Sequence, residues 1–369
     1  MNRLQSLDAF RGFTIAAMIL VNNPGTWKNI YAPLRHGEWW GITPTDLIPS
    51  AFLFIVGVAI AFAYTRRKKA GEPMSKMYSK IIIRSLKIFL AGMLLNLLGL
   101  IPDMDFEMLR WTGTLHRIAF VFLFCGLFFL HTSWQIQALT ASAILLLYYA
   151  VLAFIPTPGY GCVMLEPGIN IAHWVDQHFL PGYMWQGNWD PEGILANISS
   201  IVTGITGMLA GAYLLSSDSW ERKVINLFFA GGLAIIAGII WGWGSVLGIN
   251  TNLWSPAYVL VSSGFAASAL AGCIYLIDIL GKKNHPLVNF GVIYGMNAIA
   301  VYVLADLLAP IFYGIKFHGL PLNDWFIHFM SELLIFTPKF ASICYAILYV
   351  LICFLPAYLL YRKKIFIKL

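Results

Sequence analysis

The chain has 369 residues, of which 59% are hydrophobic and only 11% are charged. Soluble domains carry about 25% charged residues, so this composition excludes a water-soluble globular protein. Apolar runs recur along the chain, each about twenty residues long and able to cross a hydrocarbon core about 30 Å thick. The net charge of +7 arises from short basic clusters between these runs, which does not indicate a nucleic-acid partner. We therefore expect a polytopic membrane protein.

The hydropathy pattern predicts an all-α bundle of about ten membrane-spanning helices, and an even number places both termini on one side. The first apolar run follows Asp8 and Arg11 and lacks a small-residue cleavage site after it, which indicates a retained span and not a signal peptide. No internal repeat is visible, so we expect a single transmembrane domain over residues 1–369. The predicted spans cover residues 7–23, 46–64, 81–100, 113–130, 134–155, 197–215, 224–246, 256–280, 288–309 and 340–361.

The distribution of basic residues indicates which side holds the termini. With the N-terminus in the cytoplasm, all 24 Lys and Arg residues fall on the cytoplasmic side except Lys28, Arg35, Arg110, Arg117, Lys316 and Lys339. The positive-inside rule therefore favours cytoplasmic termini.

Three outward segments, 24–45, 156–196 and 310–339, are long and rich in Trp, Gly and Pro. Long structured loops often carry function, and we expect 156–196 to contribute to a binding site. An acidic outer surface favours a cationic or amine-bearing ligand, although the positive-inside asymmetry alone also leaves acids outside. The outward acids are Glu38, Asp103, Asp105, Glu107, Glu166, Asp176, Asp190, Glu192, Asp324 and Glu332.

Ionisable residues near the ends of the apolar runs are candidates for function, because charge is costly in lipid. Asp8 and Arg11 are spaced i,i+3 at the inner end of the first run. They form either an interfacial ion pair that fixes the depth of the helix or, together with Arg84, a phosphate-binding mouth, since guanidinium groups clamp phosphate well.

The segment between the first two runs carries His36, and the second run opens at Thr43-Pro44-Thr45-Asp46. A histidine between two membrane helices can act as a general base or nucleophile near neutral pH, or it can be a solvated loop residue. Asp46 is either a helix cap or the group that orients the imidazole. A nearby amide such as that of Asn22 can stabilise a developing oxyanion.

Three further groups have both structural and functional interpretations. Arg117, at the start of the fourth run, needs either a structural partner or a water-filled cavity. Asp190 and Glu192 precede the sixth run and either cap a helix or, beside Trp189, accept hydroxyl bonds from a sugar. Asn297 and Asp306 fit interhelical contacts. Metal-binding, P-loop, dinucleotide and zinc-protease patterns are absent, so no metal is expected.

Several ordered blocks resemble the heparan-alpha-glucosaminide N-acetyltransferases, a family of transmembrane acyltransferases. The resemblance covers essentially the whole chain. It is carried by Leu4–Gly12 (LQSLDAFRG), Asn22–Asp46, Asp190–Leu195 (DPEGIL), Asn252–Ser255 (NLWS), Gly295–Asn297 (GMN) and Tyr361–Phe366 (YRKKIF).

The resemblance implies transfer of an acetyl group from cytosolic acetyl-CoA to a terminal glucosamine on the far side of the membrane. It matches His36 to the family's active-site histidine and Asn22 to its asparagine, and we add Asp46 as the orienting acid. It also suggests a homodimer, and we expect a bacterial inner membrane. We expect acetyl-CoA contacts from Arg11, Arg84, Arg117 and Asn297, and acceptor contacts from Trp189, Asp190, Glu192 and Glu38.

The sequence departs from the animal enzyme of this family in two ways. We expect the additional N-terminal luminal domain with its leading span to be lacking, and Ala305 stands where that enzyme has a histidine. The acceptor is therefore either free glucosamine or a glycan fragment. His36 either deprotonates the amine directly, which we favour, or carries the acetyl group itself. An amino-sugar transporter, a transport-coupled acetylase and a non-catalytic scaffold are the alternatives.

Overall fold

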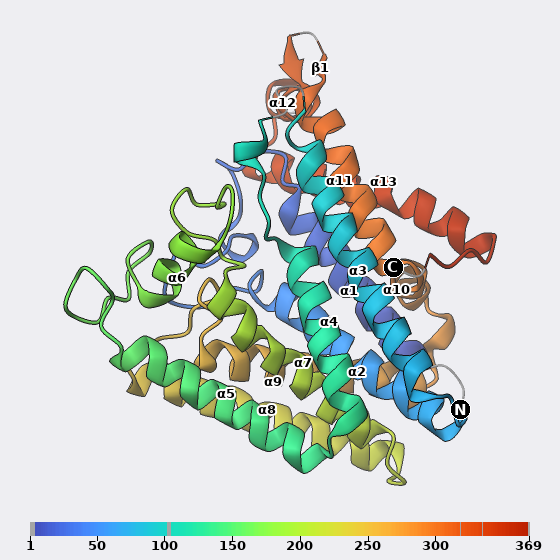
Figure 1. The fold of residues 1–369 in the computed structure, drawn as a ribbon. Helices are drawn as coiled ribbons and strands as arrows, with labels where there is room; N and C mark the ends of the chain where they lie inside the picture. The colour runs from blue at the N-terminus through green and yellow to red at the C-terminus, as the bar shows by residue number, and fades with distance from the viewer. Residues whose placement is uncertain (1–3, 102–104, 318, 334, 368–369) are drawn as a thin grey trace. The chain divides into compact units, whose positions relative to one another are not determined.

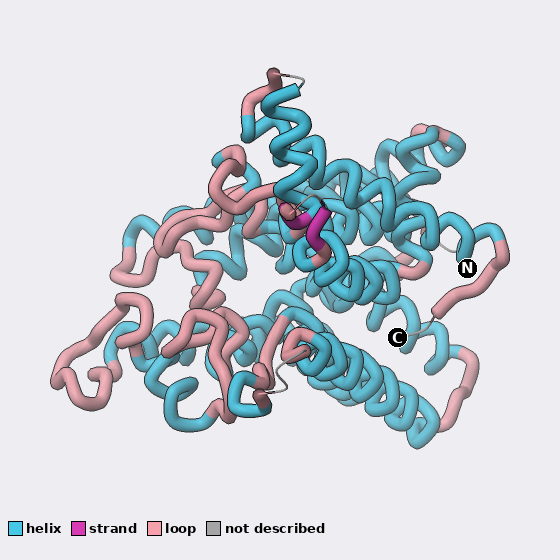
Figure 2. The backbone as a smooth tube through the Cα atoms, turned by 90° about the horizontal axis from the view of Figure 1, so that it is seen from above, coloured by secondary structure: helices cyan, strands magenta, loops and turns pink. Residues whose placement is uncertain are grey.

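The computed structural model describes residues 4–101, 105–317, 319–333 and 335–367. Arg3, Asp103 and Lys368, which contribute to the predicted charge pattern, lie outside these ranges. Within the described residues the chain is helix and loop, apart from one antiparallel hairpin of β1 (Lys316–Phe317) and β2 (Leu320–Pro321) (Figure 2). The prediction of an all-α fold is confirmed.

The described chain forms two compact units. The first contains the chain up to His36, Thr43–Ile48 and the chain from Cys273 onward, and the second contains Gly37–Ile42 and Pro49–Gly272. The long helices of the first unit are α1 (Gln5–Asn22), α10 (Pro286–Met296), α11 (Ala298–Gly314) and α13 (Pro338–Arg362). Its shorter helices are η1 (Ala32–Leu34), η3 (Ile274–Ile279), η4 (Lys282–Asn284), α12 (Leu322–His328) and η5 (Phe329–Leu333).

Helices α1 and α10 pack side by side along a seam of glycines (Figure 1). A Cβ atom on Gly12 would lie 1.7 Å from the carbonyl oxygen of Gly291, and one on Gly295 would lie 1.9 Å from the carbonyl oxygen of Asp8. These distances are far below van der Waals contact, so only glycine lets the two backbones approach this closely.

The predicted span 288–309 is broken. Helices α10 and α11 meet at Asn297 with a bend of 81°, so the pair is either one broken span or a re-entrant segment. Asn297 has φ −126° and ψ 34°, which lies outside the helical region and interrupts the helical hydrogen-bond pattern at this residue.

The second unit is built around α7 (Ile194–Leu214), which packs against α4 (Thr114–His131) and α5 (Trp134–Phe154). A Cβ on Gly204 would meet the Cys125 Sγ at 2.6 Å, and one on Gly207 would meet the Phe54 carbonyl oxygen at 2.0 Å. Glycines therefore also set the close packing of α7 on its neighbours. The other elements are α2 (Leu47–Lys69), α3 (Met74–Leu98), η2 (Phe106–Met108), α6 (Ile171–Phe179), α8 (Trp220–Gly244) and α9 (Pro256–Cys273).

Eight helices among the described residues are long and apolar enough to cross a bilayer: α2, α3, α4, α5, α7, α8, α13 and α9 continued through η3. The bent pair α10 and α11 would be a ninth. The first predicted span, 7–23, forms helix α1, which is not among these helices; Gln5, Asp8 and Arg11 make its N-terminal half polar. Only 22% of the apolar windows of α3 and α8 is buried, against 61% for α2 and α4, so the rest of the chain leaves most of the apolar surface of α3 and α8 uncovered. The chain is a multi-pass membrane protein.

Candidate active site

The segment that follows α1 is fixed by backbone capping and by contacts from three other helices. Both the backbone amide and the side-chain Nδ2 of the buried Asn23 donate to the carbonyl oxygen of Ile19, at 3.1 and 2.9 Å, which closes α1. Tyr313 Oη donates to the Pro24 carbonyl oxygen at 2.8 Å, and Asn323 Nδ2 donates to that of Gly25 at 3.0 Å. The Gly25 amide donates to a carbonyl of α13. The half-buried Asn22 at the end of α1 therefore stands on a rigid backbone.

His36 and Asp46 form a hydrogen-bonded pair in the first unit. The imidazole Nδ1 lies 2.7 Å from Asp46 Oδ1; the histidine side chain is 54% exposed, whereas the carboxylate is fully buried. The other oxygen of the carboxylate accepts the backbone amide of Thr43 at 2.8 Å. The Thr43 amide thus holds the carboxylate through Oδ2, and Oδ1 binds the His36 ring.

This arrangement selects one tautomer of His36. A carboxylate can only accept, so Nδ1 carries a proton, and in the neutral ring Nε2 is then the atom with the lone pair. The same logic holds the histidine of Ser-His-Asp enzymes in the form that takes a proton from a nucleophile. The pair can therefore act as a general base at a surface open to solvent.

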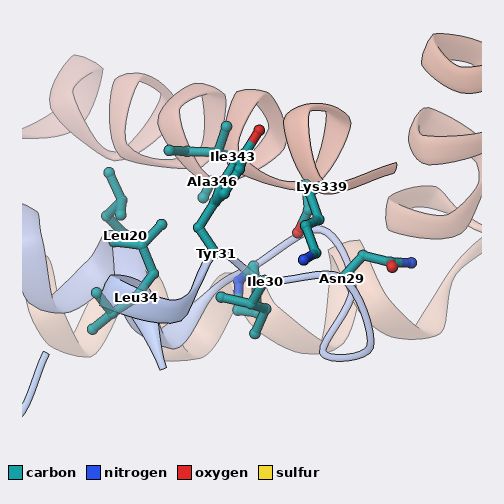
Figure 3. A pocket seen from close by; sticks show the side chains of 11 residues that line it. Leu20, Asn29, Ile30, Tyr31, Leu34, Lys339, Ile343 and Ala346 are labelled. Carbon is teal, nitrogen blue, oxygen red and sulfur yellow. The ribbon is translucent and has the colours of Figure 1, made fainter. Parts of the chain in front are cut away.

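A small pocket lies beside this segment in the first unit (Figure 3). Lys339 and Asn29 stand at one end of the pocket, and the apolar side chains of Leu20 and Leu34 stand at the other. Its walls come from the end of α1, the stretch around η1 and the first turns of α13, and His36 is not part of the lining.

Two of the predicted acetyl-CoA residues lie in the first unit: Arg11 at the contact between α1 and α10, and Asn297 where α10 meets α11. Arg11 Nη1 lies 3.4 Å from Asp8 Oδ1 and 3.5 Å from the Gly295 carbonyl oxygen, and 22% of the Arg11 side chain is exposed. The buried Asn297 donates from Nδ2 to the Ile365 carbonyl oxygen at 3.1 Å and accepts the Ile367 amide on Oδ1 at 2.8 Å. Both ends of the Asn297 amide are therefore engaged by the chain's own C-terminal segment.

The other two predicted acetyl-CoA residues lie in the second unit and differ in burial. Arg84 is exposed on α3, with its guanidinium carbon 4.8 Å from the ring centroid of Phe122. Arg117 is buried: its Nε donates to Asn197 at 2.9 Å and one Nη donates to the Pro191 carbonyl oxygen at 2.5 Å. Its guanidinium also lies 4.3 Å from the ring of Trp254. The partners of Arg117 thus favour the structural interpretation over phosphate binding.

Asp190 and Glu192 meet Arg110 in a buried ionic cluster. The Arg110 guanidinium donates to both oxygens of Asp190, at 2.7 and 2.6 Å, and to Glu192 Oε2 at 2.6 Å. Asp190 also accepts the Thr112 hydroxyl at 2.7 Å, and its side chain is 0% exposed. Burial alone would raise the pKa of Asp190, but the hydrogen bonds and charge of Arg110 hold it below the usual range. Asp190 therefore braces the loop internally.

Trp189 belongs to an aromatic cluster with Trp39 and His173. Its ring stacks on His173 with centroids 4.5 Å apart, and Trp39 meets both rings edge-on. Burial lowers the pKa of His173 to about 3, so this imidazole is neutral. Glu38 is exposed beside Trp39 in the sequence. Of the four predicted acceptor residues, Glu38 is exposed, Trp189 and Glu192 are partly exposed, and Asp190 is buried.

Asp176 on α6 caps the start of α7 from a site mostly shielded from water. Its Oδ1 accepts the Ile194 amide at 2.8 Å, and a Cβ on Gly193 would come within 1.9 Å of Oδ2. Burial raises the pKa of Asp176 to about 7; the nearby Asp190 adds to this rise, while the Ile194 amide and Arg117 oppose it. The folded protein therefore holds a proton here that the unfolded chain releases near pH 4.

Stability should consequently fall as the pH rises from about 4 to about 7, and an asparagine at this position should remove that dependence. We expect Asp176→Asn, which keeps an acceptor for the Ile194 amide, to match the wild type at pH 4 and below and to unfold at a higher temperature than the wild type at pH 8. Thermal unfolding of both proteins across this range measures the difference. A difference that stays constant with pH would contradict the assignment.

Sequence reasoning singled out His36 and Asp46 but gave no role to Arg110, His173 or Thr43. The acidic pair Asp190 and Glu192 indicated a cation partner, yet the sequence does not show that Arg110, 80 residues earlier, supplies it. Thr43 carried a detectable signal, because a Thr three residues before an acid is typical of a helix start.

Comparisons with known proteins agree with the resemblance. A family model described as the catalytic region of heparan-alpha-glucosaminide N-acetyltransferase matches residues 3–173. Over an alignment of 420 positions, gaps included, the chain is 28% identical to the heparan-alpha-glucosaminide N-acetyltransferase of Mus musculus and 26% identical to that of Homo sapiens. All of this chain is covered in both alignments, and it spans 61% and 60% of the length of these curated relatives. The predicted relationship to this family is confirmed.

Proposed function

We propose that this relative of the heparan-alpha-glucosaminide N-acetyltransferases moves an acetyl group from acetyl-CoA to the amine of a glucosamine-type sugar across a membrane. The observation that carries the proposal is the His36–Asp46 pair, a half-exposed imidazole with Nδ1 held 2.7 Å from a buried carboxylate. An amine acceptor must lose a proton to attack a thioester, and this pair supplies the base.

In the proposed reaction His36 takes up one proton and later returns it. The amine nitrogen attacks the thioester carbonyl, and Nε2 of His36 takes the proton that the nitrogen loses. The carbon–sulfur bond then breaks, and the proton passes from His36 to the CoA thiolate. We propose that the side-chain amide of Asn22 stabilises the oxyanion, which is the role that the resemblance assigns to it. We favour this direct route over an acetylated His36, since it needs no stored acyl-imidazole.

Acetyl-CoA is too polar to cross lipid, so its phosphates must be held at the cytoplasmic side while its thioester reaches inward. Of the four residues expected to contact it, Arg84 is exposed and Arg11 is partly exposed, with 22% of its side chain open to solvent. We propose these two as phosphate ligands. Asn297 and Arg117 are buried as well as hydrogen-bonded within the chain, and are assigned to structure. No group of three metal-ligating side chains was found among the described residues, and the proposed chemistry needs none.

For the acceptor, we propose the segment 156–196 together with Glu38. The ring of Trp189 offers an apolar face to a pyranose, and Glu38 and Glu192 offer carboxylates to hydroxyl or ammonium groups. We further propose one transmembrane domain, a homodimer, cytoplasmic termini and a bacterial inner membrane.

The test is acetylation by the purified protein in sealed vesicles loaded with radiolabelled acetyl-CoA, with sugars added outside. Glucosamine and an oligosaccharide ending in glucosamine should gain label outside the vesicle, whereas N-acetylglucosamine, which has no free amine, should not. Accumulation of unmodified glucosamine inside the vesicle would replace the proposal with an amino-sugar transporter. Acetylated sugar found only inside would instead indicate a transport-coupled acetylase.

A further inference from the structure

Thr43 contacts the chain on both sides of the His36–Asp46 pair. Its backbone amide donates to Asp46 Oδ2 at 2.8 Å, and its hydroxyl lies 2.6 Å from the Arg35 carbonyl oxygen and 3.0 Å from the same Oδ2. The Arg35 carbonyl belongs to the peptide bond that leads into His36. One residue therefore ties the backbone of the histidine to the carboxylate that the histidine binds.

A second threonine, Thr45, makes a similar bridge to the segment that precedes His36. The hydroxyl of the buried Thr45 donates to the Pro33 carbonyl oxygen at 3.1 Å. The pairs Arg35–Thr43 and Pro33–Thr45 keep the register of an antiparallel ladder, with side-chain hydroxyls in place of backbone amides. The two bridges differ in that Thr45 gives its single proton to Pro33, whereas Thr43 also faces the Asp46 carboxylate.

The need for such a bridge follows from the exposure of the ring. More than half of the His36 side chain is open to solvent, so packing alone cannot hold the imidazole. The Asp46 carboxylate fixes Nδ1 only if the distance between the backbones of His36 and Asp46 is maintained. Misplacing a catalytic group by about 1 Å costs roughly 100-fold in rate.

We propose that Thr43 is a positioning residue that keeps Nε2 of His36 aimed at the acceptor amine. The proposal rests on the proposed acetyl transfer and goes beyond it by assigning the geometry of the base to a side chain that does not touch substrate. Its hydroxyl donates its one proton to the Arg35 carbonyl oxygen and so sets the peptide plane before His36, while its amide holds Oδ2 of Asp46, so that Oδ1 faces the ring.

The kinetic test compares three purified variants. Thr43→Val keeps the shape and the amide but loses the hydroxyl, and it should lower kcat about 10- to 100-fold with little change in KM for either substrate. Thr43→Ser restores the hydroxyl and should stay within about threefold of the wild type. Thr45→Val, the matched control, loses a hydroxyl bond of the same kind and should also stay within about threefold. Equal losses for Thr43→Val and Thr45→Val would overturn the proposal. If Thr43→Val does not fold, Thr43→Ala takes its place with the same expectation.

A double-mutant cycle with Asp46→Asn separates positioning from simple stability. If Thr43 acts through the pair, adding Thr43→Val to Asp46→Asn should cost little more than Asp46→Asn alone, because the geometry is already lost. Multiplicative losses would show two independent effects and overturn the proposal.

A readout without turnover distinguishes this inference from the proposed function. In protein labelled with ¹⁵N-histidine, the hydrogen-bonded Nδ1 proton of His36 should give a downfield signal that disappears in His36→Ala. We expect that signal to persist in Thr43→Ser and Thr45→Val and to broaden or move upfield in Thr43→Val. An unchanged signal in Thr43→Val would overturn the positioning role. A changed signal in a protein that acetylates no sugar would support the positioning role and refute the proposed function.

Discussion

Replacing His36 by alanine should lower acetyl transfer by about 10²- to 10⁴-fold, since the only base held beside a buried carboxylate in the described part of the first unit is then removed. Binding of CoA should change little, because the proposed phosphate ligands Arg11 and Arg84 are not altered. Transfer of radiolabel to glucosamine measures the first quantity, and isothermal titration with CoA measures the second.

His328 provides a matched control for this variant. It is 55% exposed, close to the 54% of His36, and its Nδ1 also lies near a carboxylate, Glu332, at 3.0 Å. The difference is that Glu332 is 70% exposed whereas Asp46 is fully buried. His328→Ala should therefore leave turnover within about twofold of the wild type, as surface ion pairs contribute little. Retained turnover in His36→Ala would remove the imidazole from the chemistry.

Replacing Arg110 by methionine should strongly destabilise the folded protein. The substitution leaves the buried Asp190 carboxylate without the two guanidinium bonds that compensate its charge, and Glu192 loses one. Breaking a buried ion pair from one side costs about 3–5 kcal/mol. We expect a clear fall in the thermal unfolding midpoint in detergent, together with faster proteolysis in the segment 156–196.

Arg222→Met is the comparison for the Arg110 variant. Arg222 lies 3.9 Å from Asp218 and is 71% exposed, so its removal should cost about 0–1 kcal/mol. A double variant, Arg110→Met with Asp190→Leu, should recover part of the loss, since it removes the uncompensated charge. Equal unfolding midpoints for Arg110→Met and Arg222→Met would show that the cluster does not brace the loop.

Hydropathy gave the fold class and the positions of the helices because membrane spans are long and continuous in the sequence. The break at Asn297 was not visible in that pattern, since α10 and α11 are both apolar and the residue that separates them binds a segment about 70 residues later. The hydropathy of the chain carries no information about such a partner.

The candidate site shows the same limit. His36 and Asp46 are only ten residues apart. The sequence could therefore suggest two roles for Asp46, a helix cap or a partner of the imidazole, and the structure shows the contact with the imidazole. Arg117 and Asp190 were expected near ligands because isolated charges in apolar surroundings need partners. Their partners are other residues of this chain, 74 to 80 positions away, and only the folded structure identifies them.

The glycine seam between α1 and α10 has a consequence for biosynthesis. Gly12 leaves the ribosome more than 270 residues before Gly291, which at about 5–20 residues per second is a delay of tens of seconds. During that time α1 has been made but its close-packing partner does not yet exist. Tyr313 and Asn323, which hold the segment behind Asn22, are translated later still. A nascent chain therefore cannot assemble the proposed catalytic centre until nearly all of it has been made.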